Sequence, residues 1–202
     1  MSIFVLDMDT NTYRIENARK TQASEIAWLI MEAMDHDCCR NFAGPGHTLD
    51  DFHAMLTELV GMEQSQYSYR NTLCAMAGDD IAGMLVGYDG KDLLKLRQAF
   101  ICKAKERLGQ DFSSMDEETQ AGEYYLDSLC VKQKYRKQGI ASALLHEAIR
   151  RHGDQPVGLL VDLTHPWAER LYLALGFRFV NETTWGGHQM RHLQYHSGNA
   201  GK

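Results

Sequence analysis

The feature that most constrains the fold is a strand, a helix and a second strand in immediate succession in the second half of the chain. Residues 123–131 (EYYLDSLCV) alternate as a strand does, and residues 141–152 carry apolar side chains at helical spacing. Residues 157–163 (VGLLVDL) form a nearly continuous apolar run, which is typical of a buried strand. Hairpin signals at 71–88 and 177–194 flank this unit, so we expect a mixed α/β sheet.

The other segments predict the elements around that sheet. Residues 13–18 alternate as a first strand, and residues 41–47 are expected to form a loop. Helical spacing of apolar residues predicts a first helix that has Ser24 as its N-cap. It also predicts helices over 49–62, 92–108 and 166–175.

Composition and charge exclude several classes of protein. The 202-residue chain carries a net charge of −6 without long runs of Lys or Arg, so a nucleic-acid surface is not expected. No apolar run approaches the ~20 residues of a membrane helix, and residues 2–6 (SIFVL) lack the basic flank of a signal peptide. The five cysteines are odd in number, which fits reduced thiols and a cytoplasmic protein.

One local cluster invites a metal ion. Residues 35–39 read Asp-His-Asp-Cys-Cys, but nothing downstream completes a site at the usual ligand spacing. We therefore expect no metal.

A loop with the features of an anion site joins the first strand of the central unit to its helix. Arg136 and Lys137 precede Gly139, and the helix follows at once. The first amides of a helix have no partner within the helix, and a glycine lets an anion approach the backbone. A plain turn followed by a helix start would produce the same pattern, so the loop alone leaves both interpretations open.

Two motifs together resemble a known family. Residues 136–141 (RKQGIA) have the form R-x-x-G-x-A, and residues 168–177 (AERLYLALGF) have the form A-x-x-L-Y-x-x-x-G-F. Together with the buried strand between them, they resemble the acetyl-CoA-binding core of the GNAT superfamily of N-acetyltransferases. The resemblance implies an α/β (α+β) GNAT fold: a mixed, mostly antiparallel sheet flanked by helices, with the fourth and fifth strands splayed apart. It also implies one domain over 1–202, with a helical insertion at about 91–122.

The resemblance implies a cofactor site for acetyl-CoA. The pantetheine arm would lie along the strand end, and the diphosphate would lie on the loop and the helix start. Further contacts would come from the start of the last helix, where His165 stands at a position that is Asn in many relatives. The residues implied are Leu129, Cys130, Val131, Arg136, Lys137, Gln138, Gly139, Ile140, Ala141, His165, Ala168 and Tyr172.

Acyl transfer to an amine needs a base for the amine and a proton for the departing thiolate. By the same resemblance, Tyr172 matches the tyrosine that GNAT proteins place near the thioester sulfur, so it is the candidate acid. Strict alternation would put Glu123, Asp127, Leu129 and Val131 on one face, so Asp127 and Glu123 are candidates for the base. Two alternatives stay open. Asp127 would bind the amine or anchor loops, or a water chain would serve as the base. Cys130 is expected to be a small strand residue rather than a nucleophile.

The acceptor site is less defined by the sequence. Tyr88, Asp127 and His188 are candidates to bind it. The predicted activity is acetyl transfer from acetyl-CoA to a primary amine of a small molecule or peptide, by direct attack in a ternary complex. A CoA-binding sensor of the same fold without turnover and O-acyl transfer are the alternatives. The helix at 92–108 would either cover the acceptor cleft or serve a homodimer.

Overall fold

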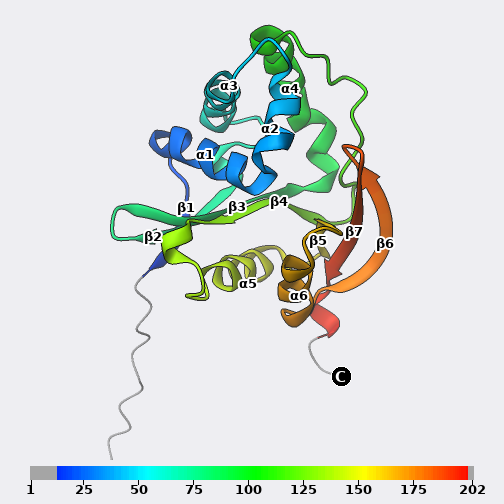
Figure 1. Cartoon of the computed structure of the whole chain (residues 1–202). Helices are drawn as coiled ribbons and strands as arrows, with labels where there is room; N and C mark the ends of the chain where they lie inside the picture. The colour runs from blue at the N-terminus through cyan, green and yellow to red at the C-terminus, as the bar shows by residue number, and fades with distance from the viewer. Residues whose placement is uncertain (1–12, 200–202) are drawn as a thin grey trace, which may run out of the picture.

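The computed structural model describes residues 13–199, in which seven strands form one sheet in the order β1-β2-β3-β4-β5-β7-β6 (Figure 1). The residues 2–6 considered above lie outside this range. All neighbouring strands are antiparallel except β4 and β5, which are parallel. The strands are β1 (Arg14–Asn17), β2 (Thr72–Ala77), β3 (Asp80–Asp89), β4 (Tyr124–Val131), β5 (Val157–Asp162), β6 (Arg178–Trp185) and β7 (His188–Tyr195). The mixed, mostly antiparallel sheet that was predicted is therefore confirmed.

Helices cover both faces of this sheet and divide the interior into two main cores. Figure 1 shows α1 (Ala23–Met34), α2 (His36–Ala43), α3 (Leu49–Gly61) and α4 (Leu93–Leu108) on one face. On the other face lie α5 (Ile140–His152) and α6 (Pro166–Ala174). The first core packs the apolar sides of α1, α3 and α4 on β2 and β3, and the second packs α5 under β2–β5 and β7. We call these the α1 face and the α5 face.

Two local predictions on the α1 face are wrong. The first helix begins at Ala23 rather than after Ser24, because a short 3₁₀ turn over Lys20–Gln22 leads into it. The segment expected to be a loop over 41–47 is helical as far as Ala43. Asp35 caps α2 by accepting hydrogen bonds from the amides of Asp37 and Cys38. This side chain, which was considered above as part of a metal cluster, thus serves as a helix cap.

β4 and β5 part soon after they meet. Their ladder contains only the pairs Tyr124 with Val157 and Tyr125 with Gly158. Beyond these pairs β4 is paired only with β3, whose Val86 lies opposite Ser128 and whose Gly87 lies opposite Leu126. One residue, Asp127, is therefore left over as a β-bulge, which bends a strand. The splay that the resemblance implied is present.

The bulge corrects the predicted alternation along β4. Leu129 and Val131 pack in the core of the α5 face, whereas Asp127 reaches Gln66 and Tyr88 on the α1 face. The extra residue shifts the alternation by one position, so residues before and after it exchange faces. The prediction that Asp127 shares a face with Leu129 and Val131 is therefore wrong.

Aromatic contacts join the segment after β3 to the β6–β7 hairpin. The Phe42 ring of α2 lies 5.1 Å from the Phe112 ring and 6.4 Å from the Trp185 ring, between centroids. Phe100 of α4 lies 5.4 Å from Phe112. The start of α4 packs with Tyr125 of β4 and Leu160 of β5, so this helix covers both strands on the α1 face. Between residues 13 and 199, no helix is both long enough and apolar enough to cross a membrane.

Candidate active site

The loop between β4 and α5 is fixed by one acidic residue of the β2–β3 turn. Asp80 accepts the Lys132 ammonium at 2.5 Å, the Lys134 ammonium at 2.6 Å and the Tyr135 hydroxyl at 3.0 Å. The hydrogen bonds from Lys132 and Lys134 hold the pKa of Asp80 well below its usual range. Lys132 and Lys134 are thus paired with Asp80, and these contacts fix the path of the loop before α5 begins.

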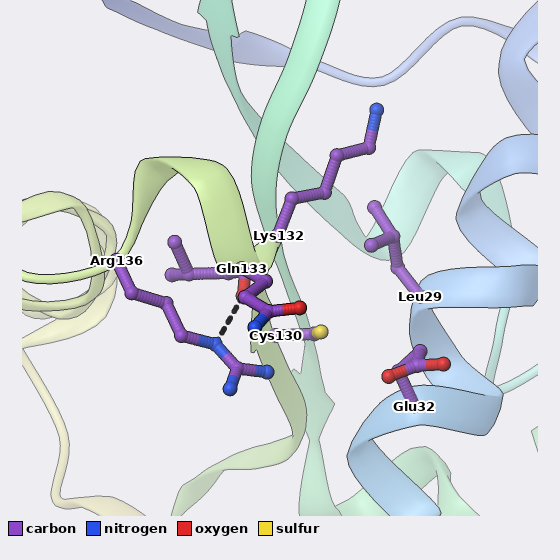
Figure 2. Close-up of a pocket in the computed structure, with 7 residues that line it drawn as sticks. Leu29, Glu32, Cys130, Lys132, Gln133 and Arg136 are labelled. Carbon is purple, nitrogen blue, oxygen red and sulfur yellow. Dashed lines mark hydrogen bonds between the residues drawn. The ribbon is translucent and has the colours of Figure 1, made fainter.

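The start of α5 remains open toward solvent. Gly139 has φ +78°, and a Cβ added there would meet nothing closer than the Tyr13 hydroxyl at 4.0 Å. No side chain caps the helix, and its first turn contains no acidic residue. Among residues 13–199, no carboxylate pairs with Arg136 or Lys137, and the Arg136 Nε donates to the Val131 carbonyl at 3.0 Å (Figure 2). Unpaired amides, two free cations and an open glycine together suit a diphosphate.

A pocket of 430 Å³ adjoins this loop and the end of β4. Figure 2 shows Leu29 and Glu32 of α1 on one side, Arg136 on the other, and Cys130 and Gln133 between them. Burial raises the pKa of the Cys130 thiol to about 11, with the Glu32 carboxylate adding to the rise. The thiol is thus protonated at neutral pH, which agrees with the prediction that Cys130 is a strand residue and not a nucleophile.

Asp127 belongs to a largely buried polar network on the α1 face. Ser128 Oγ donates to Asp127 Oδ1 at 3.0 Å, and Tyr88 Oη and Gln66 Nε2 each lie 3.4 Å from Oδ2. Burial raises the pKa of Asp127, although the hydrogen bonds from Ser128 and Gln66 and the nearby Arg97 oppose the rise. A carboxyl whose pKa is raised binds a proton more readily than an ordinary carboxylate does.

The network extends into the segment that precedes β4. Tyr88 Oη donates to Glu118 Oε1 at 2.7 Å, and Glu118 forms an ion pair with Arg97 of α4. Arg97 also donates to the Met115 carbonyl at 3.3 Å. Sequence reasoning missed Gln66, Arg97 and Glu118, because an arginine on a helix and a glutamate in an acidic loop look like surface residues. Their burial depends on contacts distant in the sequence.

Glu123 lies in a separate ring of donors. Its carboxylate accepts Thr119 Oγ1 at 2.6 Å, Gln194 Nε2 at 2.7 Å and His192 Nε2 at 2.8 Å. Burial acts to raise its pKa, but hydrogen bonds from His192, Thr119 and Gln194 outweigh burial, and the pKa is lowered. Such a carboxylate is held ionised and satisfied, as a structural anchor is.

The last helix carries three residues singled out from the sequence. Tyr172 packs edge-on against Phe177 at 5.9 Å, and burial raises the pKa of its hydroxyl to about 12. Ala168 is buried in the core of the α5 face, and His165 is exposed at the N-cap of α6. His188, at the β6–β7 turn, contacts Asp162 Oδ2 at 2.9 Å. The hydroxyl of Tyr172 is therefore in its protonated form throughout the neutral range.

Comparisons with known proteins agree with this geometry. A family model described as an acetyltransferase (GNAT) domain matches residues 97–179. An N-acetyltransferase from Staphylococcus aureus Mu50 is 21% identical, with a TM-score of 0.79 over 90% of this chain and 99% of that one. A solved acetyltransferase is 26% identical, with a TM-score of 0.75 over 91% of this chain and 98% of that one. No curated protein matches the sequence.

A more distant fold relative was solved with ligands. It is a NatC complex bound to Gag peptide and CoA, 15% identical, with a TM-score of 0.53 over 91% of this chain and 97% of that one. GNAT acetyltransferases use acetyl-CoA, and the open helix start and the splayed strands described above are the features that such a cofactor needs. The domain match over residues 97–179, the splayed sheet and the solved relatives together support a GNAT acetyltransferase fold for this chain.

Proposed function

We propose that this protein transfers an acetyl group from acetyl-CoA to a primary amine of a small molecule or peptide, by direct attack in a ternary complex. The observation that carries the proposal is the start of α5. Gly139 is open in front, the helix has no side-chain cap, and Arg136 and Lys137 pair with no carboxylate of the described chain. Residues 136–141 would hold the diphosphate through backbone amides and these two cations.

The edge of β4 offers the next part of the proposed site. From Leu126 onward this strand pairs only with β3, so the backbone groups on its other edge face the gap toward β5. Leu129, Cys130 and Val131 would contact the pantetheine arm there, as a neighbouring strand would. An amide of Leu129 or Cys130 would donate to the acyl oxygen as negative charge develops on it.

Asp127 and Tyr172 are the residues proposed to move protons. Bound acetyl-CoA supplies a thioester, from which the acetyl group passes to the amine as a C–N bond forms and the C–S bond breaks. Asp127 takes the proton that the amine nitrogen gives up, which its raised pKa favours. Tyr172 donates a proton to the leaving sulfur, since its pKa of about 12 keeps the hydroxyl protonated until then. We assign Glu123 an anchoring role, because three donors already occupy its carboxylate.

Tyr88 and His188 are proposed to border the acceptor rather than to react with it. Tyr88 lies beside Asp127 on the α1 face, and His188 lies at the β6–β7 turn against Asp162. We further propose that residues 13–199 act as a single domain in which the segment at about 91–122 is an insertion over the acceptor site.

Thermal unfolding with and without acetyl-CoA tests the proposal. A ligand at ~100 times its dissociation constant stabilises the native state by about 2.7 kcal/mol, which for a chain of this length raises Tm by roughly 5–10 °C. Gly139→Glu should abolish the shift, because a carboxylate then occupies the place of the diphosphate. Gly78→Glu is the matched control, since Gly78 also has positive φ (+63°) and open space before it.

The presence or absence of the Tm shift decides between two cases. A shift that Gly78→Glu keeps and Gly139→Glu loses supports the diphosphate site. Thiol release from acetyl-CoA with a panel of primary amines then tests transfer itself. No shift in the wild-type protein at saturating acetyl-CoA would overturn the proposal.

A further inference from the structure

We propose that Arg97 of α4 and Glu118 of the following loop are positioning residues that control when Asp127 holds a proton. The inference rests on the proposed function of Asp127 as the base and adds a role for the segment between β3 and β4. Neither Arg97 nor Glu118 reaches the gap between β4 and β5 in the contacts that the structure shows. They act on Asp127 through Tyr88 and Gln66.

The direction of one hydroxyl proton links Glu118 to Asp127. Tyr88 Oη lies 2.7 Å from Glu118 Oε1 and 3.4 Å from Asp127 Oδ2. A tyrosine hydroxyl has one proton, and the shorter distance assigns it to Glu118. Tyr88 Oη then faces Asp127 only as a hydrogen-bond acceptor. Such an acceptor favours the protonated form of Asp127, because only that form has a proton to donate. Glu118 thereby prepares a place for the proton that Asp127 accepts.

The balance of charge around Asp127 also depends on Arg97 and Glu118. Arg97, Glu118, Tyr88 and Gln66 are each less than a tenth exposed. Among the described residues, the titratable groups that face Asp127 are Arg97, Glu118 and the hydroxyls of Tyr67, Tyr88 and Tyr125. Burial raises the pKa of all three hydroxyls well above 10, so they carry no charge.

One cation therefore faces two carboxyl groups. The ion pair commits Arg97 to Glu118, so the positive charge that would otherwise stabilise ionised Asp127 is largely neutralised. Met115 contributes a carbonyl to the same guanidinium, which fixes the pair within the segment itself. The segment at about 91–122, which was predicted only as an insertion, thus carries the two charges that set the pKa of Asp127 on β4.

A carboxyl titration in the ligand-free protein tests this without any turnover. Aspartate labelled with ¹³C at the side-chain carboxyl reports each pKa by NMR, and Asp127→Asn assigns the resonance. Glu118→Gln should lower the pKa of Asp127 by about one unit, because Arg97 then acts on Asp127 alone. Arg97→Gln in the Glu118→Gln background should return the pKa upward by a similar amount.

The variants are chosen so that folding does not decide the result. Glu118→Gln keeps the size of the side chain and leaves Asp127 as the counter-charge of Arg97, and the double variant removes the buried ion pair as a whole. Removing Arg97 alone would leave Glu118 buried without its partner, so that variant is avoided. Arg97→Lys is the conservative control and should keep the wild-type titration, since it keeps the charge.

The acid limb of the kcat profile against pH should follow the same order. With acetyl-CoA and an amine that the wild type acetylates, the limb should move to lower pH in Glu118→Gln and back in the double variant. An Asp127 titration that is unchanged in both variants would overturn the inference. Failure of the proposed function would look different: no thiol release with any amine, while the NMR titration still responds to Glu118→Gln.

Discussion

Gly158→Ala is expected to destabilise the protein, although alanine suits a strand better than glycine does. Gly158 pairs with Tyr125 in the last step of the β4–β5 ladder. An added Cβ would overlap Oε2 of Glu123 and lie 2.5 Å from its Cδ. The carboxylate can move only by leaving Thr119, His192 and Gln194, whose donors lie 2.6 to 2.8 Å away.

The expected magnitude follows from those contacts. Overpacking costs about 1–3 kcal/mol, and hydrogen bonds to a charged group contribute about 1.5–3 kcal/mol each. Partial loss of one or two hydrogen bonds to Glu123 therefore predicts a decrease of about 2–4 kcal/mol in the free energy of unfolding. For a chain of this length the corresponding fall in Tm is roughly 5–15 °C. Urea unfolding followed by circular dichroism gives the free energy of unfolding directly.

A double-mutant cycle shows whether the clash is the cause. In a Glu123→Ala background the space is free, so Gly158→Ala should cost less than about 1 kcal/mol there. Gly46→Ala is the matched control, because a Cβ at Gly46 meets nothing within 4 Å, and it should change stability by less than about 0.5 kcal/mol. Equal costs of Gly158→Ala in both backgrounds would refute the reasoning, as would a Gly158→Ala protein as stable as the wild type.

Three further outcomes are expected. Tyr172→Phe should lower kcat about 100-fold or more and leave KM for acetyl-CoA nearly unchanged, both measured by thiol release. An unchanged kcat would show that Tyr172 is not the acid. Cys130→Ala should keep turnover, because a thiol with a pKa near 11 is protonated and forms no acyl-enzyme, and loss of turnover in a folded variant would contradict this. Glu123 has a lowered pKa, so its stabilisation is present above its unfolded pKa of about 4.3 and is lost as pH falls through the folded value. Glu123→Gln should therefore flatten the acid side of a plot of urea midpoint against pH, and an equally steep plot would argue against the anchor.

Local signals predicted most of the order of elements and the glycine-containing loop before α5, because those signals are carried by neighbouring residues. The apolar spacing of α5 and the position of Gly139 before it are examples. The bulge at Asp127 has no such signal: one extra residue in β4 is defined only by its pairing with β3, and strict alternation therefore placed Asp127 on the wrong face. The Arg97–Glu118 pair escaped prediction for a related reason, since burial of two charges in one place depends on how α4 and its loop fold over the sheet.

The short ladder between β4 and β5 makes the sheet two half-sheets that share a narrow seam. Two residue pairs and the Glu123 ring hold this seam at one end, and nothing in the ladder holds the other end. A ligand that pairs with the free edge of β4 would turn the two halves into one continuous sheet. The slowing of amide hydrogen exchange along Leu129–Val131 would then record the joining of the halves, and the opening angle of the seam would set how deeply such a ligand can enter.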